Sequence, residues 1–168
     1  MRKLSNFEKL MVLLTASQKK EGYWVDIDLV AELVAYGDEW ALSWKYQWFD
    51  EEDHPKDPIV SETVKIFEMM RHAKNSAEEL GKPELFNDLY FDGFDGNNDE
   101  HHGIAQVLVN KLDRFTDIPN AASNSHSAGS LPRYRAMLKR YAPIKEELLA
   151  GAQYKLMSEE QLKILAGE

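Results

Sequence analysis

The chain has 168 residues and no cysteine, which excludes disulfide bonds, thiolate catalysis and cysteine-ligated zinc and fits a reducing cytoplasm. A chain of this length can bury about 70% of its unfolded surface, so a single domain needs neither a disulfide nor a metal for stability. The net charge of −9 argues against general nucleic-acid binding, because phosphate neutralisation dominates such binding, and no apolar run is long enough to span a membrane.

Helical signals begin near the N-terminus. Ser5 and Glu8 form a capping box for a first helix, and the segment shows no signal-peptide pattern, which supports a cytoplasmic location. A second helix is expected over about Ile27–Tyr36, and Gly37 ends it. No stretch alternates in the way that a half-buried strand does, so we predict an all-α fold.

Three tryptophans follow at successive spacings of four: Trp40, Trp44 and Trp48. In one helix they form a large apolar face with an N–H donor on each ring. We interpret this face as core or as a subunit interface. The alternative is an aromatic cradle for a peptide, a nucleobase or a cation. Tryptophans that stack on bases normally lie beside a basic groove, whereas the acidic residues 50–53 follow here.

A charged loop at residues 50–57 precedes a long helix. Its four carboxylates beside His54 invite a metal hypothesis, but consecutive carboxylates on a flexible loop rarely converge, and we interpret the segment as a solvated loop. Asp57 then caps a helix that has Pro58 at its first position and ends at Gly81.

The stretch at residues 89–109 combines aromatic, acidic, glycine and asparagine residues and then becomes an apolar helix. Gly93 and Gly96 mark backbone positions that need a positive φ. Asn97 is expected to be the N-cap, and Glu100 completes a capping box into a helix that ends near residue 115. A structural turn followed by a helix start explains nearly every residue.

The same turn holds the candidate binding residues, which are Asp92, Gly93, Phe94, Asp95, Gly96, Asn97, Asn98 and His102. Their oxygen atoms suggest a calcium loop, but no register gives the glycine and glutamate positions of an EF-hand. His101 and His102 are adjacent and would point about 100° apart on a helix, whereas zinc histidines usually stand four residues apart. We therefore predict no metal and no cofactor.

A long loop follows at residues 116–130, rich in Ser, Asn, Ala and Gly. It contains His126, which has no acidic partner nearby in the sequence. The next helix is expected from Ser130 to about Tyr141, where Pro143 restarts or kinks it.

The last third of the chain is locally basic. We interpret its cations as a solvated helix face that pairs with acidic neighbours; they are Arg133, Arg135, Lys139, Arg140 and Lys145. Ser158 and Gln161 then cap a short terminal helix.

The run GFDGNN at residues 93–98, followed by an acidic residue and a helix, resembles the signature of the YfbU family. Other matching stretches are NFEKL at 6–10, VKIFEMM at 64–70, VNKL at 109–112 with Arg114 and Phe115, and PRYRAML at 132–138. At His101-His102-Gly103 relatives more often carry an aromatic and an aliphatic residue, which leaves the two histidines without family support. The resemblance implies a bacterial, soluble, helical protein and supplies no mechanism.

We therefore predict one compact multi-helix domain over residues 1–168, with a long loop before its C-terminal helices. The favoured function is a non-enzymatic module that self-associates or binds another protein, because the sequence holds no complete catalytic set. One alternative is a small hydrolase or ligand-binding protein that uses the turn at residues 91–102. Another is a nucleic-acid-associated regulator that uses the basic segment at residues 133–145.

Overall fold

The computed structural model describes residues 4, 8, 11, 12, 15, 25–46, 58–150 and 155–168. Over these residues the chain is all-α, as predicted, and its only extended pairing is an isolated parallel bridge between Phe94 and Asn124. The α-helices are α2 (Ile27–Tyr36), α3 (Leu42–Lys45), α4 (Pro58–Glu79), α5 (Glu84–Asn87), α6 (Glu100–Gln106), α7 (Ser130–Leu149) and α8 (Glu159–Ala166). A 3-10 turn, η1 (Glu39–Ala41), precedes α3, and a π-helical turn, η2 (Val107–Lys111), follows α6.

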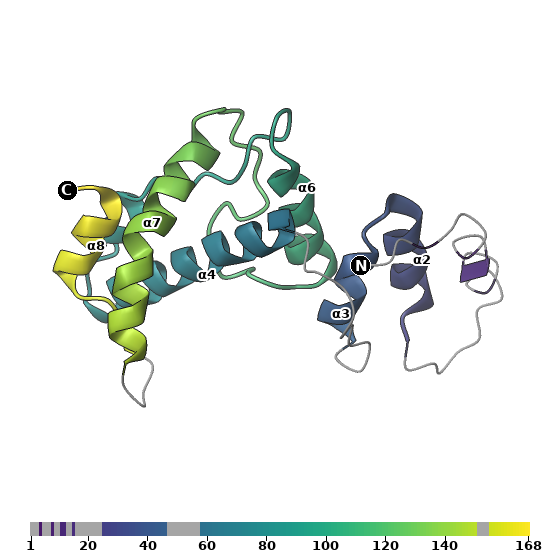
Figure 1. The fold of residues 1–168 in the computed structure, drawn as a ribbon, viewed down its shortest axis with the longest axis horizontal. Coiled ribbons are helices and arrows are strands. Elements are labelled where there is room, and N and C mark those ends of the chain that lie inside the picture. Colours follow the sequence, from purple (N-terminus) through teal and green to yellow (C-terminus); the bar gives the residue numbers. More distant parts are fainter. Residues whose placement is uncertain are drawn as a thin grey trace.

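The long helix α4 is the centre of the arrangement (Figure 1). It packs against α5, α6, α7 and α8, while α2 and α3 lie beyond its α6 end. Its apolar residues recur at helical spacing and are almost fully buried: Ile66, Phe67, Met69, Met70, Ala73 and Ala77. The core thus forms around one helix that touches most of the others.

Four aromatic rings form the middle of this core. The Phe67 ring on α4 lies 6.1 Å from that of Phe91, 5.9 Å from that of Phe94 and 5.0 Å from that of Phe115. These partners come from the turn before α6 and from the loop after η2, so α4 holds two irregular segments in place by ring packing.

The local helix signals are confirmed at α2 and α8. Asp26 accepts the Leu29 N–H at 3.1 Å, and Gly37 ends α2 with a φ of 83°. Ser158 and Gln161 form the predicted capping box of α8. The predicted long loop is also present, because no helix lies between Lys111 and Ser130.

Two predicted helices differ from the structure. The helix predicted to carry three tryptophans is a 3-10 turn and one α-helical turn that ends at Tyr46, where the backbone is extended; Trp48 lies outside the described residues. The predicted end near Tyr141 and restart at Pro143 are wrong, because α7 continues through the proline to Leu149. Burial of side chains on both sides of the proline outweighs the lost backbone hydrogen bond.

Several further predictions fall outside the described residues: the Ser5 cap, the loop at residues 50–57 and the Asp57 cap. None of the helices in the described ranges combines the length and the apolar character needed to cross a bilayer.

His72 fastens α4 to two later segments. Its ring is 3% exposed, with Nδ1 2.7 Å from the Tyr141 hydroxyl and Nε2 2.9 Å from the Lys155 carbonyl oxygen. One turn later, the Ser76 hydroxyl accepts the Met157 N–H at 2.9 Å. The segment that leads into α8 is therefore held on α4 by polar contacts as well as by apolar packing.

Burial lowers the pKa of His72, because the imidazolium would lose its hydration. The unfolded chain thus takes up this proton at a higher pH than the native state does, and the free energy of unfolding should fall as the pH drops from ~7 to ~5. Urea unfolding across this range should show a shallower pH dependence in His72→Gln. The exposed His126→Gln should keep the wild-type slope, and an unchanged slope in His72→Gln would contradict the assignment.

Candidate functional site

Tyr134 on α7 fixes the start of the candidate turn. Its ring is fully buried between Phe91 and Phe94, at centroid distances of 5.1 and 5.6 Å. Its hydroxyl lies 2.7 Å from Asp92 Oδ1 and 2.8 Å from the Gly93 carbonyl oxygen, and it accepts the Asp92 N–H at 3.2 Å. Burial raises the pKa of the Tyr134 phenol, so it keeps the proton that it donates.

Gly93 allows the turn to pair with the long loop. Its φ is 86°, and a Cβ at this position would stand 2.1 Å from the Ser123 carbonyl oxygen. The next residue exchanges backbone hydrogen bonds with that loop: Phe94 donates to Ser123 at 3.3 Å and accepts from Ser125 at 3.0 Å. The prediction of a positive φ is confirmed at Gly93, and the close approach gives a second reason for glycine.

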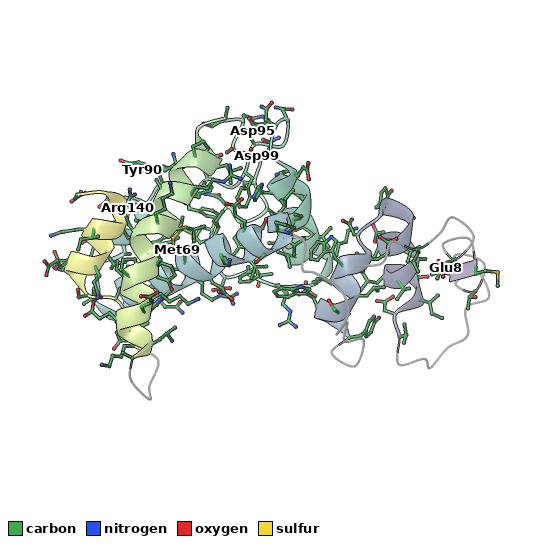
Figure 2. The ribbon with its side chains drawn as sticks, in the orientation of Figure 1. Glu8, Met69, Tyr90, Asp95, Asp99 and Arg140 are labelled. Atoms are coloured by element: carbon green, nitrogen blue, oxygen red, sulfur yellow. The ribbon has the colours of Figure 1, made fainter. Side chains whose placement is uncertain are left out.

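Asp95 organises the tip of the turn. The residue is 3% exposed, and its carboxylate accepts the Asn97 N–H at 2.9 Å and the Asn98 side-chain amide at 2.8 Å. The Asn98 amide, followed by the Asn97 N–H, lowers the pKa of Asp95. The Asp99 carboxylate accepts the Asp95 N–H at 3.2 Å, and Figure 2 shows the two aspartates together at this tip.

The predicted N-cap at Asn97 is wrong by two residues. The cap position is Asp99, without a side-chain cap bond, and α6 begins at Glu100. Asp95 takes the Asn97 N–H for its own turn, which places one more bend before the helix.

Gly96 and His102 lie on one side of the tip. The Gly96 N–H donates to Asn124 Oδ1 at 3.0 Å, and its φ is not positive, so the predicted positive φ is wrong here. A Cβ at Gly96 would meet the Asn124 amide at 2.6 Å and the His102 ring at 3.1 Å. Close packing explains this glycine.

His101 belongs to a different cluster. It is 4% exposed and stacks on Phe94, and its Nε2 lies 2.8 Å from Glu62 Oε2 on α4. Its Nδ1 is buried and has no hydrogen-bond partner among the described residues. Arg135 on α7 donates twice to the same carboxylate, at 2.9 and 2.8 Å, and lowers the pKa of Glu62 to about 2.

The basic residues of α7 are largely engaged by acidic partners. Arg133 pairs with Asp92, Arg135 with Glu62, and Lys145 with Glu68; the respective N–O distances are 3.0, 2.8 and 3.6 Å. This confirms, for these three pairs, the interpretation of the basic segment as a paired helix face.

The candidate residues are therefore neighbours in the sequence, but their side chains contact different partners and do not converge on one site. Asp92 faces Tyr134, Asp95 closes its own turn, His102 packs against Gly96, and His101 reaches Glu62. Across residues 25–46, 58–150 and 155–168, no three His, Cys, Asp or Glu side chains are grouped to hold a metal. Tyr134 was missed by the sequence analysis, although its place in the apolar spacing of α7 marked it as buried.

The tryptophans form no part of this turn. Trp40 and Trp44 are half-buried and pack against the core, and Trp40 Nε1 donates to Asp38 at 3.3 Å. Arg114 donates to the Trp44 carbonyl at 3.3 Å. Core packing accounts for the buried part of both side chains, and a subunit interface stays a prediction.

The family to which the chain belongs is shown by a match over nearly its whole length. The family model for the YfbU domain matches residues 1–167. The chain belongs to the YfbU family. No curated protein and no solved structure matches it. Within this YfbU domain, residues 93–98 form the turn that Tyr134, Ser123 and Asn124 hold in place.

Gly93→Ala should destabilise the fold by at least ~2 kcal/mol, because it adds both a backbone clash and a strained φ. Chemical denaturation followed by circular dichroism measures the change. Gly103→Ala is the matched control in α6: its Cβ meets nothing within 4 Å, and it should stabilise the fold by up to ~1 kcal/mol. Equal effects of the two substitutions would show that the bridge to Ser123 is not required.

Proposed function

We propose that this YfbU domain is a non-enzymatic interaction module that self-associates through a surface centred on Tyr90. The observation that carries the proposal is the conformation of Tyr90. Its φ is 51° and its side chain is 68% exposed. Bulky residues rarely adopt a positive φ, and such strain costs about 1 kcal/mol or more.

Phe115 provides the comparison within the same chain. It also has a positive φ, of 58°, but it is 7% exposed, packs on Phe67 and lies under the Arg71 guanidinium at 4.5 Å. Core packing offsets the backbone strain at Phe115. Tyr90 gains no such burial against the part of the chain that the structure describes, so a role for its ring outside the chain explains the residue better.

The backbone around Tyr90 is fastened on both sides. Leu89 and Phe91 are buried, the Tyr90 N–H donates to Asn87 at 3.0 Å, and the Arg133 guanidinium binds the Tyr90 carbonyl. The ring points away from the ribbon in Figure 2. A pre-ordered, exposed tyrosine loses little conformational entropy on binding and is a typical interface anchor.

The charges next to Tyr90 suit a second copy of the chain. Asp88 is exposed, and Arg133 stays partly exposed while it pairs with Asp92, so the patch carries both signs. A two-fold contact would place an acidic residue of one copy near a basic residue of the other. The adjacent turn also supports a non-enzymatic function, because the carboxylates of Asp92 and Asp95 accept hydrogen bonds from residues of the fold itself.

Tyr90→Asn separates strain from binding. Asparagine tolerates the left-handed region, so the monomer should become more stable by about 1 kcal/mol, while self-association should be lost. Chemical denaturation and sedimentation equilibrium measure the two effects.

Tyr36→Asn is the matched control, because Tyr36 is 78% exposed at the end of a regular helix. It should leave association unchanged. A monomeric wild type, or wild-type association in Tyr90→Asn, would contradict the proposal. Loss of association in Tyr36→Asn alone would favour the tryptophan-bearing end of the molecule instead.

A further inference from the structure

A hollow lies between α4, α7 and the start of α8, apart from the turn described above. Its volume is about 450 Å³, which falls in the usual range of small-molecule sites. Three apolar side chains form its floor, a fourth lies at its open side, and two exposed glutamates stand at its rim; they are, in that order, Leu148, Leu156 and Met157, then Leu80, then Glu79 and Glu147.

Hydrogen bonds between side chains and the backbone preform this hollow. The Ser76 hydroxyl holds the Met157 N–H, and the Ser158 capping box fixes the first turn of α8. Leu148 and Met157 are 8% and 2% exposed, whereas Leu80 is 41% exposed at the open side. The apolar floor is thus part of the core that solvent reaches from one side.

The charge at the rim is of one sign. Among the residues that the structure describes, no lysine or arginine lines the hollow, and no ion pair involves Glu79 or Glu147. Gln161 Nε2 donates to one oxygen of Glu147 at 3.2 Å, which orients that carboxylate. The nearby cations Lys82 and Lys163 both bind Glu159 instead.

We propose that this hollow binds an aliphatic ammonium compound, with its alkyl chain on the leucine and methionine floor and its ammonium group between Glu79 and Glu147. An anion would be repelled by the rim. A neutral apolar compound would cover the floor but would remove water from the carboxylates without replacing it. Only a cation with an apolar tail matches both parts of the site.

Three probes with six carbon atoms each test the proposal: n-hexylamine, n-hexanol and n-hexanoate. Each is titrated at neutral pH against the full chain, whose leucine and methionine methyl groups are isotope-labelled for NMR. The methyl signals of Leu80, Leu148, Leu156 and Met157 should shift. Hexylamine should bind about three- to tenfold more tightly than hexanol, because exposed carboxylates contribute modestly, and hexanoate should bind most weakly. Added salt should reduce the preference for the amine.

The double variant Glu79→Gln with Glu147→Gln should weaken hexylamine to the level of hexanol and leave hexanol unchanged. Glu78→Gln is the control, since Glu78 pairs with Lys74 on the same helix at 2.7 Å and does not line the hollow. Equal binding of amine and alcohol to the wild type, or an unchanged amine affinity in the double variant, would overturn the proposal. The titration also runs on Tyr90→Asn, so its outcome is independent of self-association.

Discussion

The Tyr134 hydroxyl connects α7 to the turn at residues 91–102. Three polar groups of that turn lie within hydrogen-bond distance of this one oxygen atom. The hydroxyl lies within hydrogen-bond distance of the Asp92 carboxylate and the Gly93 carbonyl oxygen, and it accepts the Asp92 N–H. The Tyr134 ring packs between the rings of Phe91 and Phe94. An unpaired buried hydroxyl or carbonyl is costly, so this contact sets the register of the turn against the helix. The bridge to the long loop and the start of α6 follow from that register.

This constraint changes how the acidic residues of the turn are understood. A set of aspartates, asparagines and histidines in one short stretch suggests chemistry, yet Asp92 and His101 bind residues on other helices, and Asp95 binds Asn97 and Asn98 within the turn itself. The same holds across the α4–α7 contact, where Glu62 receives both Arg135 and His101. Two features of the described surface are not explained by contacts within the fold: the strained, exposed Tyr90 ring and the hollow lined by Glu79 and Glu147, on which the two proposals rest.

The sequence predicts those parts of the fold that depend on neighbouring residues. The Ser158–Gln161 box is an example, since both hydrogen bonds span three residues. The Asn97 cap was misplaced because Asp95 accepts the Asn97 N–H that the expected capping box assigns to Glu100, and spacing alone does not decide between these two acceptors. His72 is harder still, because its partners lie 69 and 83 residues away and only the packing of α4 brings them together. The turn itself was predictable, and the residues that hold it were not.

A double-mutant cycle between Tyr134→Phe and Asp92→Ala tests the central contact most directly. Tyr134→Phe keeps the ring and removes only the hydroxyl, so it should lower the free energy of unfolding by ~1.5–3 kcal/mol, as for hydrogen bonds to charged groups. The coupling energy between the two substitutions should reach at least ~1 kcal/mol. A Tyr134→Phe variant within ~0.5 kcal/mol of wild type, with additive effects in the double variant, would contradict the account.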